Sequence, residues 1–142
     1  KDGRTVGAAH AGWRGALAGV LETTLAAMLH LGAEAHAIHA VVGPCIAQES
    51  YETAEDMHTA ILTGDRQAAT FFAPGHRAGH YQFDLAGWCV FRLQRAGIGR
   101  AVTLGMDTLP DTQRFFSHRR RTLAGGGPIG HQISAIAPRR AD

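Results

Sequence analysis

The chain has 142 residues and a formal charge of +2, which suits one domain with a core of its own. No apolar run reaches the roughly 18 residues of a membrane span, and no signal peptide is recognisable, so we expect a cytoplasmic protein without a membrane partner. The basic clusters lack interleaved aromatic residues or a recognition helix, so nucleic acid is not an expected partner. Cys45 and Cys89 stand in unlike contexts, which favours free thiols over a disulfide.

Hydrophobic periodicity and turn residues predict strands alternating with helices. In chain order we expect a strand at about 4–11, a helix at about 15–31, a strand at about 37–43, a helix at about 51–63, a Gly/Pro/His-rich loop, a helix at about 84–96, and strands at about 100–105 and about 131–137. Ser50 and Asp84 are the expected N-caps of the second and third helices. The fold class is therefore α/β, with α+β as the alternative: a mixed sheet flanked by helices and opened by a βαβ unit.

The run His10-Ala-Gly-Trp-Arg-Gly lies where the first strand turns into the first helix. Gly12 allows a sharp turn there, and the N–H groups of the helix start together with Arg14 favour an anion such as phosphate. Cys45 follows the next strand of the βαβ unit, so its thiol and the imidazole of His10 are expected at the same sheet edge. The alternative interpretation of the same spacing is a structural turn in which the hydrogen bonds of the histidine ring are satisfied.

Four blocks of sequence carry a family resemblance. They are His10-Ala-Gly-Trp-Arg-Gly, then Gly43-Pro-Cys-Ile with Tyr51-Glu, then Phe83-Asp-Leu, and finally Phe115-Phe-Ser-His-Arg-Arg. Through these blocks nearly the whole chain resembles the bacterial laccase-domain proteins, also called the multicopper polyphenol oxidoreductase or purine nucleoside phosphorylase family. Because two further blocks of that pattern are missing, we expect residues 1–142 to form a single laccase-like domain that lacks its N-terminal portion.

The resemblance implies a metal site, with zinc as the expected ion and copper as the alternative. His10 would be one ligand, and the other two, a histidine and a cysteine, belong to upstream blocks that this chain does not carry. Spacing within the chain offers no tight ligand pair of its own. His76 and His80, four residues apart in the Gly-rich loop, remain a weak metal or phosphate candidate.

Other residues of these blocks are candidates for binding and catalysis. Arg14 and Cys45 are the catalytic candidates, although a small buried thiol is the alternative interpretation of Cys45. Phe116 is an aromatic ring able to stack on a base, with core packing as the alternative. The expected substrate contacts are Gly12, Trp13, Arg14, Phe116, Arg119 and Arg120.

The sequence departs from the family pattern at four positions: Ala47, Thr53, Asp107 and His131. Asp107 stands where cysteine commonly precedes threonine, and His131 where arginine is common, so these two put substrate preference in doubt.

The resemblance implies a metal-dependent purine nucleoside phosphorylase with adenosine deaminase activity, which combines transferase and hydrolase chemistry. Its partners would be purine nucleosides and inorganic phosphate, the latter as co-substrate, and an exposed sheet edge favours self-association. The alternatives are a copper-dependent polyphenol oxidoreductase and a non-catalytic binding domain.

Overall fold

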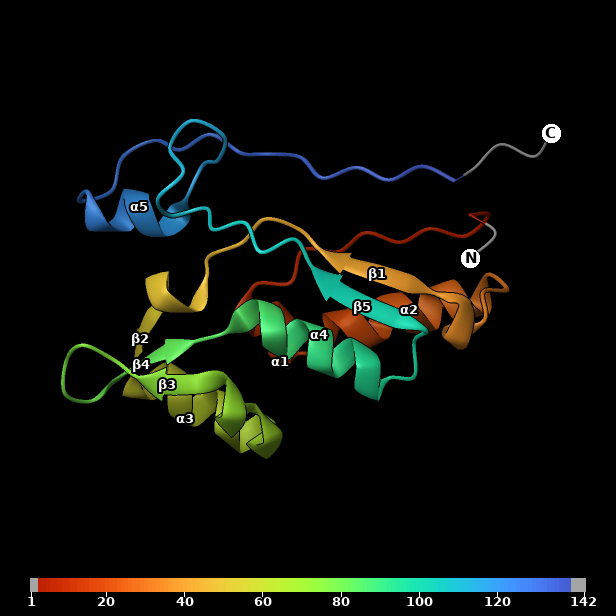
Figure 1. Cartoon of the computed structure of the whole chain (residues 1–142), viewed down its shortest axis with the longest axis horizontal. Helices are drawn as coiled ribbons and strands as arrows, with labels where there is room; N and C mark the ends of the chain where they lie inside the picture. The colour runs from red at the N-terminus through yellow and green to blue at the C-terminus, as the bar shows by residue number, and fades with distance from the viewer. Residues whose placement is uncertain (1–2, 139–142) are drawn as a thin grey trace. The chain divides into compact units, whose positions relative to one another are not determined.

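The computed structural model describes residues 3–138, which fall into two compact units (Figure 1). Unit 1 comprises the segments Lys1–Val42, Gly87–Thr103 and Ser134–Asp142, and unit 2 comprises Gly43–Ala86 and Leu104–Ile133. The chain thus passes from one unit to the other several times. Helices and both parallel and antiparallel strand pairs are present, so the predicted α/β class with a mixed strand arrangement is confirmed.

Unit 1 is a parallel strand pair packed on helices. Its elements are α1 (Trp13–Leu17), α2 (Val20–His30), the 3-10 turn η1 (Ala35–Ala37), β1 (His39–Val42), α4 (Leu85–Arg95, entered from unit 2) and β5 (Arg100–Thr103). Strands β1 and β5 pair in parallel, with His39 opposite Arg100 and Val42 opposite Thr103. The predicted strands at about 37–43 and 100–105 and the helix at about 84–96 are therefore confirmed.

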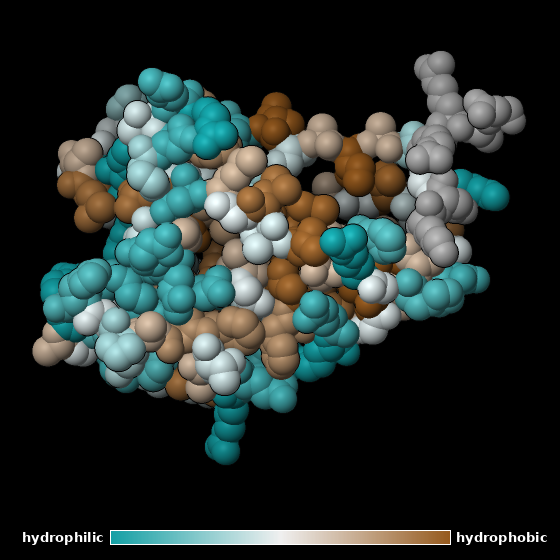
Figure 2. Space-filling view, viewed as in Figure 1, coloured by the Kyte–Doolittle hydropathy of each residue, from teal (hydrophilic) through white to brown (hydrophobic). Residues whose placement is uncertain are grey.

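The core of unit 1 lies between these strands and the helices α2 and α4 (Figure 1). Leu25, Ile98 and Ala101 are buried there, and Ile38, Ala40, Val90, Leu93 and Ala96 pack around them. Side chains alternate between the two faces of a strand, so the neighbouring Val41 points away from this core and is 60% exposed. Hydrophobic surface accordingly appears among polar side chains over β1 and β5 (Figure 2).

A buried arginine connects three helices of unit 1. Arg92 on α4 is only 8% exposed, and its Nε donates to Glu22 Oε1 on α2 at 2.7 Å. Its NH1 group donates to the carbonyl oxygen of Ala16 on α1. Because a buried cation requires partners for its N–H groups, this network ties α1, α2 and α4 together.

Unit 2 is built around a three-stranded antiparallel sheet of order β2-β4-β3. Its elements are η2 (Gln48–Ser50), β2 (Glu52–Ala54), α3 (Glu55–Gly64), η3 (Arg66–Phe71), β3 (Phe72–Pro74), β4 (His80–Phe83) and α5 (His118–Leu123). Phe83 and Ile61 are fully buried, and Phe83 stacks on Phe72 with ring centroids 4.4 Å apart. The ring of His58 on α3 contacts the rings of Phe72 and Tyr81, which joins the sheet to the helix that follows β2.

Two predicted strands are wrong. Residues 4–11 and 131–137 form no strand in the part of the chain that the structure describes, and residues 7–10 are exposed. A strand needs a neighbour for its N–H and C=O groups, and neither segment has one among the described strand pairs. The βαβ unit expected at the start of the chain is consequently not formed, and β1 pairs with β5 instead.

Two predicted helices differ from the structure. Gly19, at φ +90°, separates α1 from α2 where one helix was expected over about 15–31. The helix predicted at about 51–63 begins only at Glu55, because residues 52–54 pair with β4 as a strand. Ser50 is therefore not its N-cap; that position belongs to Ala54, which supplies no side-chain hydrogen bond.

The loop expected between the second and third helices contains η3, β3 and β4, which sequence analysis missed. Along the described residues, no helix combines the length and the apolar character that crossing a membrane demands.

Candidate functional site

The His10 segment is exposed and closely folded. His10 lies in the exposed stretch before α1, and Gly12 is the N-cap residue with extended backbone angles of φ −64° and ψ 162°. A Cβ added at Gly12 would stand 3.3 Å from His10 Nε2. The missing side chain at Gly12 therefore lets the imidazole fold back over the backbone, and a larger residue there would displace it.

Trp13 and Arg14 begin α1. The Arg14 guanidinium carbon lies 4.3 Å from the centroid of the Trp13 ring, within the range of a cation–π contact. Arg14 is exposed, so its N–H donors are open to solvent or to a ligand. Because α1 has five residues, its dipole is weak, and the predicted anion site depends on the guanidinium more than on the helix.

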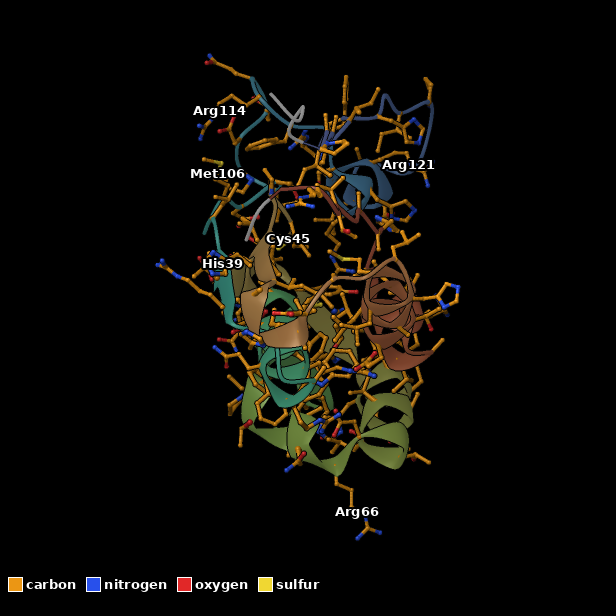
Figure 3. The ribbon with its side chains drawn as sticks, turned by 90° about the vertical axis from the view of Figure 1, so that its right-hand side faces the viewer. His39, Cys45, Arg66, Met106, Arg114 and Arg121 are labelled. Carbon is orange, nitrogen blue, oxygen red and sulfur yellow. The ribbon has the colours of Figure 1, made fainter. Side chains whose placement is uncertain are left out.

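Cys45 lies in unit 2, on the loop after β1. Its N–H donates to the Met106 carbonyl at 3.1 Å, and its own carbonyl accepts from the Thr108 N–H at 2.9 Å. Figure 3 labels Cys45 and Met106 on these two segments. Burial, followed by the negative charges of Asp84 and Asp107, raises the pKa of the Cys45 thiol. A raised pKa keeps the thiol protonated near neutral pH, which is opposite to the thiolate that a cysteine nucleophile requires.

Asp107 organises the loop that carries Cys45. Its Oδ1 accepts from the backbone N–H groups of Ala47, at 3.2 Å, and Leu109, at 2.9 Å. Its Oδ2 accepts from the Ser50 hydroxyl at 2.5 Å. This carboxylate therefore joins residues 45–50 to residues 107–109. Sequence analysis identified Asp107 only as a departure from the family pattern, because a bond across 57 residues leaves no local signal.

Helix α5 carries the two arginines predicted to bind substrate. Ser117 caps the helix by accepting from the Arg120 N–H. The Arg120 guanidinium donates to the carbonyls of Thr108, Leu109 and Phe115, and the Arg119 guanidinium donates to the carbonyl of Glu52. Most of the Arg120 donors are thus already bonded to backbone, while Arg119 keeps donors beyond its one bond.

Phe116 precedes α5 and is 51% exposed. Its N–H donates to Gln132 Oε1 at 3.0 Å, and a Cβ added at Gly130 would collide with its ring. The backbone of Gly130 therefore lies close to the tip of this ring. The remaining exposure is compatible with the predicted stacking on a base.

Asp84 of the family blocks and His131, a departure from the family pattern, both lie in unit 2. Asp84 stands directly before α4, at the predicted N-cap position. His131 is exposed in the segment without helix or strand that follows α5.

The candidate residues fall in different units. His10, Gly12, Trp13 and Arg14 belong to unit 1, whereas Cys45, Phe116, Arg119 and Arg120 belong to unit 2. Within unit 2 the structure brings Cys45 to Asp107 and α5 to β2. A pocket shared by His10 and Cys45 stays a prediction, and its original basis, a strand ending at His10, is absent.

The donor set for a metal is incomplete in the described part of the chain. Residues 3–138 contain no group of three or more His, Cys, Asp or Glu side chains placed to hold an ion. A zinc site takes three or four protein ligands, so His10 alone does not fit one. Cys45 and Cys89 are free thiols, as predicted, and Cys89 is buried in α4.

Comparison with known proteins identifies relatives along almost the whole chain. The family model of multi-copper polyphenol oxidoreductase laccases matches residues 1–139. A purine nucleoside phosphorylase of Xylella fastidiosa is 40% identical over 127 residues, which cover 87% of this chain and 47% of that protein. The Escherichia coli purine nucleoside phosphorylase YfiH is 32% identical over 126 residues, with coverage of 88% and 49%.

Solved structures show the same relationship. A Neisseria meningitidis protein superposes with a TM-score of 0.69 at 34% identity, covering 79% of this chain and 45% of that one. The YfiH protein of Bacillus licheniformis gives a TM-score of 0.71 at 28% identity, with coverage of 80% and 44%. The chain spans about half the length of the curated relatives it matches. Over that half, it belongs to the multi-copper polyphenol oxidoreductase laccase family.

Proposed function

We propose that the protein carrying this chain cleaves purine nucleosides by phosphorolysis, releasing the free base. The observation that supports this most strongly is the name shared by relatives 32–40% identical to this chain, each a purine nucleoside phosphorylase. In the reaction, inorganic phosphate attacks C1′ of the ribose, the glycosidic bond breaks, and the base leaves with a proton from solvent or the protein. The products are ribose 1-phosphate and the purine.

Arg14 is the proposed phosphate-binding residue. It is exposed, and its guanidinium lies over the Trp13 ring, which limits its freedom and leaves hydrogen-bond donors available. A guanidinium binds phosphate through paired, charge-assisted hydrogen bonds. Holding the phosphate in position reduces the entropy cost of bringing the two substrates together.

Arg119 and Phe116 are proposed to contact the nucleoside. Arg119 has guanidinium donors beyond the one bonded to the Glu52 carbonyl, and these suit ribose oxygens. Phe116 offers a half-exposed ring for the base. Arg120 is proposed to support the site through its three backbone carbonyl contacts and to contact substrate with its remaining donors. For Cys45, the raised pKa favours a neutral thiol that donates a hydrogen bond over a nucleophile.

His10 is proposed to bind zinc together with ligands from the part of the relatives that this chain does not span. His10 is exposed in the stretch before α1, so it is accessible to ligands from elsewhere. Zinc would supply Lewis-acid chemistry, and adenosine deamination is proposed as the second activity on that basis.

The phosphorolysis proposal is tested by measuring purine base released from inosine by the whole protein, with and without phosphate. Arg14→Ala should raise the KM for phosphate roughly ten- to a hundredfold, because a charge-assisted contact of about 1.5–3 kcal/mol is lost. Arg66→Ala is the matched control, since Arg66 is an exposed arginine whose side chain projects outward from unit 2 (Figure 3). Phosphate-independent base release, or an unchanged KM in Arg14→Ala, would refute the assignment.

The metal proposal has its own measurement. His10→Ala should lower the zinc content of the whole protein, determined by elemental analysis, whereas His36→Ala, at a histidine with a side chain 82% exposed, should not. Equal zinc content in wild type and His10→Ala would contradict it. Ammonia release from adenosine checks the second activity.

Copper-dependent phenol oxidation is the second candidate, because the matching family model carries the name polyphenol oxidoreductase laccase. Oxygen consumption with a phenol, independent of phosphate, separates this reaction from phosphorolysis. A protein that binds nucleosides and shows neither reaction would be a non-catalytic binding domain.

A further inference from the structure

Helix α1, which carries Trp13 and Arg14, is too short to hold its own position. It has five residues, and hydrogen bonds such as that from the Ala16 N–H to the Gly12 carbonyl, at 2.8 Å, close little more than one turn. A single helical turn is marginal in water, because the entropy cost of ordering the first turn is not offset by further turns. The orientation of α1 therefore depends on contacts with the rest of unit 1.

The carbonyl of Ala16, in the last turn of α1, provides one such contact. Ala16 is fully buried, and its carbonyl oxygen accepts hydrogen bonds from the Gly19 N–H, at 3.0 Å, and from Nη1 of Arg92 on α4 (Figure 1). The last carbonyls of a helix have no partner within the helix, so donors from elsewhere must satisfy them where they are buried. Arg92 thus binds the C-terminal end of α1 from a different helix.

The guanidinium of Arg92 is itself held by two further contacts. Its Nε donates to Glu22 Oε1 on α2 at 2.7 Å, and its central carbon lies 5.1 Å from the centroid of the Trp88 ring. Trp88 is fully buried, and Arg92 is 8% exposed. A planar guanidinium carries its donors in a rigid fork, so it holds two acceptors in a defined relative orientation, which a flexible ammonium does not. The end of α1 is therefore fixed relative to α2 and α4.

Arg14 depends on α1 for the direction of its side chain. The residue is exposed, and its guanidinium carbon lies 4.3 Å from the ring centroid of Trp13, which belongs to the same helix. Among residues 3–138, the Arg14 side chain has no hydrogen-bond or ion-pair partner. Arg14 stands two residues before Ala16 on the same short helix. Any rotation of α1 would therefore move the Arg14 donors with it.

We propose that Arg92 is a positioning residue for the phosphate site at Arg14 and acts through α1. This inference rests on the proposed function, in which Arg14 binds the attacking phosphate. Arg92 contacts α1 and not the substrate: its hydrogen bond to the Ala16 carbonyl fixes α1, and α1 directs the guanidinium of Arg14. A displacement of about 1 Å in a group that positions a substrate can cost up to about a hundredfold in rate, so the loss of Arg92 should be measurable.

The kinetic test compares Michaelis constants of the whole protein, with base release from inosine as the measured reaction. Arg92→Met should raise the KM for phosphate about five- to tenfold and leave the KM for inosine within about twofold of wild type. Partial unfolding would instead lower the maximal rate and leave both constants unchanged, because it removes active molecules without altering the others. Arg92→Lys keeps the charge and loses the fork, so it should raise the KM for phosphate only about threefold.

Two further variants show whether the effect passes through Arg14. In an Arg14→Ala background, Arg92→Met should raise the KM for phosphate no further, because the group that Arg92 positions is gone. Arg95→Met is the matched control, since Arg95 is an exposed arginine on the same helix, and it should keep both constants. An unchanged KM for phosphate in Arg92→Met, an equal rise for inosine, or a further rise in the double variant would each overturn the proposal. If Arg92→Met fails to fold by circular dichroism, Arg92→Lys decides by the same criteria.

A measurement without turnover separates this inference from the proposed function. The NMR order parameter of the Arg14 backbone N–H, measured on the whole protein without substrate, should fall in Arg92→Met and recover in part in Arg92→Lys. The backbone N–H of Tyr81, on the central strand of the unit 2 sheet, should keep its order parameter. If the order parameter falls while Arg14→Ala leaves the KM for phosphate unchanged, the phosphate assignment of Arg14 is wrong and the fixing of α1 by Arg92 stands. An unchanged order parameter at Arg14 would overturn the proposal.

Discussion

Removing the Asp107 carboxylate should loosen the loop that carries Cys45, because one side chain accepts three hydrogen bonds there. Asp107→Ala leaves the N–H groups of Ala47 and Leu109 and the hydroxyl of Ser50 without their acceptor. Each bond to a charged acceptor contributes about 1.5–3 kcal/mol, and partial access of water reduces the cost of losing it. We therefore expect a total loss of about 3–4 kcal/mol of unfolding free energy, measured by urea denaturation.

A double-mutant cycle isolates one bond of this network. Ser50→Ala alone should cost about 1.5–2 kcal/mol, through the 2.5 Å bond to Asp107, and should cost much less when Asp107 is already alanine. Asp56→Ala is the matched control. Asp56 is exposed in the first turn of α3, so its loss should change the free energy of unfolding by at most about 0.5 kcal/mol. Additive losses for Ser50 and Asp107 would refute the inferred network.

The same network affects the chemistry of Cys45. Burial is the largest cause of the raised pKa of this thiol, and the negative charges of Asp84 and Asp107 raise the pKa further. Asp107→Asn removes one charge, so the pKa should fall and alkylation by iodoacetamide at pH 8 should become faster. Cys89 is 2% exposed and serves as the internal control, since it should stay unlabelled in the folded protein. An unchanged labelling rate at Cys45 would show that Asp107 does not act on it electrostatically.

Two more predictions concern stability. Arg92→Met should lower the free energy of unfolding in urea by about 2–3 kcal/mol, because Glu22 and the Ala16 carbonyl lose their buried cationic partner. Water can reach the half-exposed Glu22 side chain, so the loss is smaller than for a fully buried pair. An unchanged unfolding midpoint would mean that the network contributes nothing. Burial raises the pKa of Glu52, but hydrogen bonds from Arg77 and the hairpin backbone outweigh it, and the pKa is lowered from 4.5. A lowered folded-state pKa gives stability that is present above about pH 4.5 and is lost as the pH falls. Unfolding free energies between pH 7 and pH 3 should show this loss in wild type and a smaller one in Glu52→Gln, and equal pH profiles would contradict it.

Local periodicity in the sequence was sufficient to predict whether each element in the core of unit 1 is a helix or a strand. The apolar spacing in α2 and α4 and the short apolar runs in β1 and β5 predict their type, because each buries its apolar side against the others. The family blocks likewise identified His10, Arg14 and the α5 arginines as candidates. These features depend on neighbours in the chain, and so they are visible without the fold.

Pairing between distant segments decided the rest. Residues 4–11 have strand-like composition but no described partner, whereas residues 52–54 were assigned to a helix and became a strand because β4 lies beside them. Only the folded chain brings Asp107 to Ser50 and Glu52 to the hairpin loop. A strand of three residues, or a carboxylate shared between two loops, gains its free energy from contacts made across many residues of chain. Sequence periodicity records the side of an element that is buried, and tertiary structure alone decides which partner buries it.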